Sequence, residues 1–212
     1  VGRFQFGTTS VASFGQIGGT SGSLSGQITH SAFTNVSALT TLQSSTLDIS
    51  EVNLLNSGTL VGTAILATGF INTSTGRIDV SGSSIMRFEG DNNTNGGIIN
   101  STGGMVSMAG NLTNSAGGQV SNFGGQIVTQ GQLNNIGFIT GRGEFTANGG
   151  FVNTGSMAFS GTADVNGNVT NNSLIVTSAN ATTTFYDSVI NNGEIRTSGS
   201  GNSVFFEAVS GS

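Results

Sequence analysis

A short motif centred on asparagine recurs along this chain and constrains its fold more than any other feature of the sequence. The motif occurs at Asn35, Asn56, Asn72, Asn100, Asn114, Asn135, Asn153, Asn171 and Asn191. An apolar residue stands two positions before each of these asparagines, and a small residue (serine, threonine, alanine or glycine) stands two positions after it. The motif therefore marks one structural unit that the chain repeats.

The spacing of the motif predicts short strands. Successive asparagines lie 14 to 28 residues apart, with a mean of 19.5. An apolar residue returns four positions after the asparagine in six copies and six positions after it in the other three. Because side chains alternate between the two faces of a strand, a shift of two residues keeps the apolar side chain on the same face. Each unit is thus expected to contain a strand, a turn at the asparagine, a second strand and a Gly-rich corner.

Such a unit cannot bury its apolar side alone, so successive units must stack and pair their strands in parallel. We predict an all-β chain folded as a parallel β-helix (β-solenoid) of about ten to eleven coils, with about 19–20 residues per coil and a length of roughly 50 Å. The nine asparagines would stack into a ladder of amide hydrogen bonds with a structural role. The core would be filled by Phe145, Phe151, Phe159, Phe185 and Phe205.

The repeat predicts a single domain over residues 1–212. Residues 1–32 are weakly patterned first coils, residues 33–207 are regular coils, and residues 208–212 form an open C-terminal end. The chain begins at Val1 without a basic and then apolar leader, which we interpret as a processed form or an excised piece. Neither end offers a polar or helical cap, so the solenoid is expected to continue end to end, into more of the same polypeptide or into another copy of itself.

Composition argues against several other classes of protein. Glycine contributes 35 of the 212 residues, and lysine, a strong helix former, does not occur, which disfavours a helical fold. Valine, isoleucine, leucine and phenylalanine recur throughout, unlike in disordered chains. A net charge of −5 leaves no basic surface for nucleic acid. No apolar run approaches the roughly 18 residues of a membrane-spanning helix, and the absence of cysteine excludes disulfides and thiolate metal sites.

Few ionisable side chains are candidates for chemistry. Asp187 and Glu207 occupy matching places in two similar segments 20 residues apart, so they are expected to stand one above the other. They are either two solvated surface carboxylates or weak candidates for a calcium contact. Residues 90–97 lack the spaced acids of a calcium loop and are expected to protrude as a loop, and His30 has no second imidazole beside it. With no catalytic motif in the sequence, we expect no enzyme, no catalytic residue and no cofactor.

The pattern of an apolar residue, asparagine, glycine and a second apolar residue at every other position is clearest over residues 151–157 and 189–195. It resembles the repeats of filamentous-haemagglutinin and autotransporter-passenger proteins, and those of Gly/Asn-rich repeat surface proteins of environmental bacteria. This resemblance covers residues 33–207. It implies a right-handed parallel β-helix on the outside of a bacterial cell, and it implies no particular ligand.

These observations favour a non-enzymatic structural element of an extracellular filament or cell-surface layer, whose partner is a second copy of the chain or adjoining repeats. The alternative is a surface adhesin that binds a glycan or a protein. An ice-binding solenoid would require a flat column of threonines, which the position before each asparagine does not provide. A polysaccharide-degrading β-helix enzyme would require carboxylates clustered across neighbouring coils. We expect neither a nucleic-acid partner nor membrane insertion.

Overall fold

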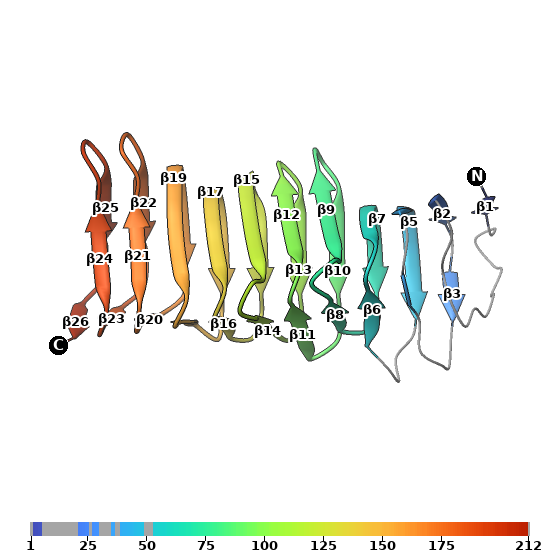
Figure 1. Cartoon of the computed structure of the whole chain (residues 1–212), viewed down its shortest axis with the longest axis horizontal. Helices are drawn as coiled ribbons and strands as arrows, with labels where there is room; N and C mark the ends of the chain where they lie inside the picture. The colour runs from blue at the N-terminus through green and yellow to red at the C-terminus, as the bar shows by residue number, and fades with distance from the viewer. Residues whose placement is uncertain are drawn as a thin grey trace.

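The computed structural model describes residues 53–211 in full. Before them it describes the backbone of five strands: β1 (Gly2–Gln5), β2 (Ser21–Ser25), β3 (Gln27–Thr29), β4 (Asn35–Val36) and β5 (Leu39–Asp48). The coils follow one another along the long axis, with the two ends of the chain at opposite ends of the molecule (Figure 1). No described residue is helical, and hence no helix of the described residues could cross a membrane.

Two parallel sheets run the length of the molecule. The smaller has ten strands, and those after β4 are β6 (Leu54–Asn56), β8 (Phe70–Asn72), β11 (Asn92–Asn95), β14 (Asn111–Asn114), β16 (Leu133–Asn135), β18 (Phe151–Asn153), β20 (Val169–Asn171), β23 (Val189–Asn191) and β26 (Val209–Gly211). Each pairs in parallel with the strand one coil away. Nine of them fall within residues 53–211 and span about eight turns of a β-solenoid.

The larger sheet has sixteen strands. Those after β5 are β7 (Thr59–Leu66), β9 (Arg77–Ser81), β10 (Ile85–Phe88), β12 (Ile98–Thr102), β13 (Met105–Met108), β15 (Gln119–Thr129), β17 (Phe138–Ala147), β19 (Ser156–Asn166), β21 (Leu174–Thr177), β22 (Thr182–Phe185), β24 (Glu194–Thr197) and β25 (Asn202–Phe205). Strands β1, β2 and β3, from the weakly patterned residues 1–32, also belong to this sheet. The parallel β-solenoid expected from the sequence is thus confirmed, while its right hand stays a prediction.

A coil turns sharply three times: after a strand of the smaller sheet, at a corner within the larger sheet, and before the next strand of the smaller sheet. Glycine is required where the backbone comes close to the coil before. A Cβ on Gly137, after the first turn, would lie 2.3 Å from the carbonyl oxygen of Gly118. At the second corner, Gly141 has a φ of +119°, and a Cβ there would lie 1.8 Å from the carbonyl oxygen of Asn122. The register of β17 against β19 shifts between Gly141 and Gly143, so this corner is a β-bulge.

The core is a column of apolar side chains between the two sheets. Phe145, Phe151, Phe159 and Phe185 are buried as predicted, and Phe205 packs against them partly exposed. The rings of Phe145 and Phe159 meet edge to face with centroids 5.4 Å apart, and those of Phe185 and Phe205 stack at 5.1 Å. Aromatic contacts therefore continue from coil to coil along the axis.

The loop predicted at residues 90–97 is wrong. Residues Asn92–Asn95 form β11 and pair with β8 and β14, and the side chains of Asn93 and Asn95 are buried. The polar residues suggested a solvated loop, but the alternation of β11 turns two of its asparagines into the protein, where their amides bond to neighbouring coils.

Two substitutions test which side chains point into the narrow core and which point to solvent. Phe151 is 2% exposed, so Phe151→Asp would place an unpaired charge among apolar side chains and should cost more than about 4 kcal/mol of unfolding free energy. Glu194 is exposed, and Glu194→Ala should change the unfolding free energy by less than about 0.5 kcal/mol. Urea melts of both variants check the prediction, which equal destabilisation would contradict.

Candidate functional site

Eight asparagines form one continuous ladder at the first turn of the coils. We define the asparagine ladder as Asn56, Asn72, Asn95, Asn114, Asn135, Asn153, Asn171 and Asn191. In every step the Nδ2 of one asparagine donates to the Oδ1 of the asparagine one coil further, at 2.7–2.8 Å. Seven hydrogen bonds therefore run in one direction along the axis.

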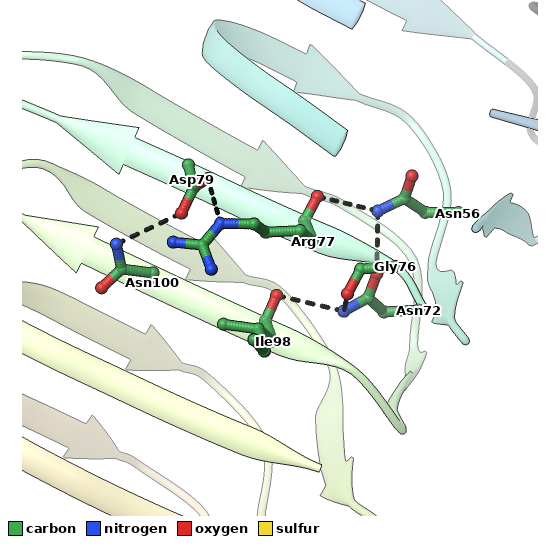
Figure 2. Close-up of polar contacts among 7 residues, drawn as sticks. All are labelled: Asn56, Asn72, Gly76, Arg77, Asp79, Ile98 and Asn100. Atoms are coloured by element: carbon green, nitrogen blue, oxygen red, sulfur yellow. Dashed lines mark hydrogen bonds and ion pairs between the residues drawn. The ribbon is translucent and has the colours of Figure 1, made fainter. Parts of the chain in front are cut away.

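Each ladder amide from Asn56 to Asn171 also donates to a backbone carbonyl group of the next coil. Asn56 Nδ2 donates to the carbonyl oxygen of Arg77 at 3.0 Å, and Asn72 Nδ2 donates to that of Ile98 at 3.2 Å (Figure 2). Asn153 repeats the contact on Leu174 at 3.1 Å. These carbonyl groups belong to the first residue of a strand in the larger sheet, so the ladder joins the turn to both sheets.

The ladder amides are deeply buried. Exposure is 0% or 1% for every member from Asn56 to Asn171. A buried amide is costly unless it is hydrogen-bonded, and a chain of aligned amides strengthens its own bonds. At the N-terminal end of the ladder, Asn56 Oδ1 is buried and accepts no hydrogen bond from any described residue.

Seven of the nine asparagines predicted from the motif lie in this ladder, and two do not. Strand β4 pairs with β6 so that Asn35 lies opposite Leu55 and Val36 lies opposite Asn56. This register leaves Asn35 one position short of the ladder. The other exception is Asn100.

The assignment of Asn100 to the ladder is wrong. Asn100 lies in β12 of the larger sheet, where its Nδ2 donates to Asp79 Oδ1 at 3.2 Å (Figure 2). Asn95 takes the ladder position instead, between Asn72 and Asn114. The physical reason is chain length, because the 14 residues from Asn100 to Asn114 are too few to pass through both sheets, whereas Asn95 gives a coil of 19 residues.

The motif misled here because the correct asparagine lacks its apolar neighbour. Asn93 stands two positions before Asn95 and pairs with Leu112 in the core row, where it is 2% exposed. Its Nδ2 donates to the carbonyl oxygen of Asn111 at 3.0 Å, while its Oδ1 accepts no hydrogen bond from any described residue. Ile98, which the motif placed in that row, is instead partly exposed in β12.

Asp187 and Glu207, expected as solvated surface carboxylates or as weak candidates for a calcium contact, both accept hydrogen bonds from the protein itself. Asp187 Oδ2 accepts a hydrogen bond from the backbone nitrogen of Gly167 at 2.7 Å. Glu207 Oε2 accepts one from Ser188 Oγ at 2.8 Å. Each side chain thus forms a hydrogen bond to the preceding coil, close to where that coil turns. Within residues 53–211 no group of three or more histidine, cysteine, aspartate or glutamate side chains could hold a metal ion.

A second carboxylate pair was missed in the sequence. Glu144 in β17 lies directly beside Asp164 in β19. Glu144 accepts hydrogen bonds from Gln126 Nε2 at 2.7 Å and Thr146 Oγ1 at 3.1 Å. The pair escaped notice because Glu144 is nine residues after its ladder asparagine and Asp164 is eleven after its own, the difference being absorbed at the bulged corner.

Tyr186 bonds to this pair from the next outward row of the larger sheet, two residues after Thr184, the strand partner of Asp164. Its hydroxyl donates to Asp164 Oδ1 at 3.2 Å, and its ring stacks on Phe206 at 5.2 Å. The negative charge of Asp164 raises the pKa of Tyr186 above 10.0, with smaller contributions from desolvation and from the hydrogen bond. These contacts bind neighbouring coils together at the surface.

The corrected ladder register can be tested with two alanine variants. Asn95→Ala should cost about 1–3 kcal/mol of unfolding free energy, because it removes the ladder bonds to Asn72 Nδ2 and Asn114 Oδ1 and leaves the buried Asn114 Oδ1 without a donor. Asn100→Ala removes one hydrogen bond at a partly exposed site and should cost less than about 1 kcal/mol. Urea melts of the two variants measure both values. A larger loss of unfolding free energy in Asn100→Ala than in Asn95→Ala would contradict the ladder position of Asn95 and support the position predicted for Asn100 from the motif.

Tyr186 is the one tyrosine of the sequence, so its titration can be followed by ultraviolet absorbance. A pKa raised by folding means that Tyr186 favours the folded state below its unfolded pKa, and that this stabilisation is lost as the pH rises through the folded value. Asp164→Asn should lower the pKa of Tyr186 towards 10.0, whereas Asp187→Asn, which leaves the Asp164 contact intact, should change it less. An unchanged titration in Asp164→Asn would contradict the assignment.

Comparison with known proteins assigns no family to this chain. Neither a family model, nor a curated protein, nor a solved structure matches it. The function is therefore inferred from the parallel coils, the asparagine ladder and the outward-facing side chains.

Proposed function

We propose that this chain is a non-enzymatic structural element of an extracellular filament or cell-surface layer, which extends end to end through its coils. The observation that carries this proposal is the continuity of both sheets, whose named strands all pair in parallel from coil to coil. In such a solenoid each coil is stabilised by its two neighbours, so the fold extends along one axis.

The last described coil exposes the surface that one coil offers to the next. Strands β24, β25 and β26 each pair with a strand on one side. Phe206 is 67% exposed and Val209 is 51% exposed. A further coil would satisfy the free N–H and C=O groups of these strands and bury both side chains. We take the occupant to be a coil of the same construction, because it continues both sheets and the aromatic stack.

Two features of the sequence support assembly between copies. Natural sheet edges are blocked by lysine or proline, and this sequence has neither. A head-to-tail contact without a closing rotation produces a filament. The extracellular location follows from the resemblance of the repeats to those of exported surface proteins.

The carboxylate pair Glu144 and Asp164 supports a structural role in place of catalysis. Both oxygens of Glu144 accept hydrogen bonds from surface side chains of neighbouring positions, and Asp164 accepts one from Tyr186. A general acid or base must exchange protons with a substrate, whereas these groups fasten coils to one another.

The assembly proposal is tested by sedimentation and electron microscopy over a range of concentrations. The chain should form rods whose mean length grows with concentration. Val209→Lys, which places a charge on the exposed end coil, should keep the rods short. Ser83→Lys adds the same charge to an exposed loop on the side and should assemble like the unaltered chain. A monomer at every concentration, or equal assembly of both variants, would overturn the proposal.

A further inference from the structure

Three neighbouring corners of the larger sheet differ from those on either side. Strands β15, β17 and β19 run through the corner without a break. In the flanking coils the corner is a loop between two separate strands, at residues 82–84 and 103–104 on one side and residues 178–181 and 198–201 on the other. The loops between β9 and β10 and between β21 and β22 stand further out than the three corners between them (Figure 1).

Two of these three corners carry a large exposed side chain, Phe123 in β15 and Arg142 in β17. We define the Arg142 corner as Phe123, Arg142, Ser160, Gly161 and Thr162, all of which are exposed. Phe123 is 41% exposed and is the strand partner of Arg142. On the other side the Cδ of Arg142 lies 3.0 Å from where a Cβ on Gly161 would be, so the arginine stem lies close over this glycine. The corner thus presents an aromatic ring, a guanidinium and two hydroxyl groups together.

Arg142 differs from the other arginines of the described part in having no carboxylate partner. Arg77, Arg87 and Arg196 each pair with an acid two residues away in the sequence, namely Asp79, Glu89 and Glu194. Glu144 stands at the same spacing from Arg142, yet it bonds to Gln126 and Thr146 instead. The turn of the chain explains the difference, because Gly141 and Gly143 have φ angles of +119° and +98° and bend the backbone on either side of Arg142.

We propose that the Arg142 corner binds the carboxylate of a uronic-acid unit in an acidic polysaccharide. The planar guanidinium can donate two parallel hydrogen bonds to a carboxylate. The exposed ring of Phe123 provides an apolar surface for the face of a sugar, and the hydroxyl groups of Ser160 and Thr162 can bond to sugar hydroxyls.

The charges around the corner select this ligand over denser polyanions. Residues 143–211 carry five carboxylates and one arginine, Arg196, which pairs with Glu194. A nucleic acid or a heavily sulfated chain needs several cations in a row, whereas the carboxylate of one uronic-acid unit can match the single unpaired arginine. The inference does not depend on end-to-end assembly.

Titration with oligogalacturonate at low salt tests the site, with binding followed by calorimetry on the whole chain. The unaltered chain should bind the oligomer, and should not bind neutral dextran. Arg142→Gln should weaken binding about tenfold or more, since it removes the positively charged guanidinium group and its two parallel hydrogen bonds. Arg87→Gln removes the same charge from a paired arginine and should change affinity less than about twofold. Thermal melts of both variants confirm that they are folded.

Two further measurements separate a sugar site from a general anion site. Phe123→Ala should weaken oligogalacturonate binding several-fold, while polyglutamate, which carries carboxylates without sugar rings, should bind more weakly than oligogalacturonate. No binding by the unaltered chain overturns the proposal, and so does unchanged affinity in Arg142→Gln. Equal binding of polyglutamate together with no effect of Phe123→Ala would assign the corner to acidic peptides and would equally overturn it.

Discussion

The rest of this structure depends on how the buried backbone carbonyl groups at the first turn obtain their hydrogen bonds. Each turn directs backbone carbonyl groups into the protein, where water does not reach them. Asparagine answers this demand because one side chain both accepts and donates: Asn114 accepts from Asn95 and donates to Asn135 and to the carbonyl oxygen of Phe138. Aspartate could not donate and would bring like charges together inside the protein, and serine has one hydrogen where the ladder uses two.

The ladder restricts the register and leaves the length of the coil free. Once the asparagines align, the residues two positions before them lie in one buried row, and the strands after the turn begin together. Extra residues can then be accommodated within the turn, as between Asn72 and Arg77, or at the second corner, which the ladder does not contact. The coil from Asn72 to Asn95 uses this freedom with a loop at residues 82–84, whereas the coil from Asn135 to Asn153 bends at Gly141 without a loop.

This division explains what could be predicted from sequence. The first turn carries a local signature, so the parallel solenoid and seven ladder positions such as Asn153 were predictable. The failures lie where distant contacts decide. Asn100 follows the whole motif and Asn95 only part of it, and the length needed to complete a coil decides between them. The Glu144 and Asp164 pair depends on a bulge whose offset is not visible before the strands are aligned, and the isolation of Arg142 from Glu144 depends on the turn at Gly141 and Gly143.

A fold stabilised from within by neighbouring coils places few demands on its outer surface. Outward residues need only tolerate a strand, and they differ from coil to coil: the positions of Arg87, Thr146 and Tyr186 lie in one outward row of the larger sheet. A repeat whose inner rows stay mostly apolar can therefore carry different chemistry on each coil. Under this constraint a binding site can arise where the chain turns at a corner, because a side chain there is separated from those that follow it in the strand. Arg142 is such a side chain, because Gly141 and Gly143, with φ angles of +119° and +98°, bend the backbone on either side of it.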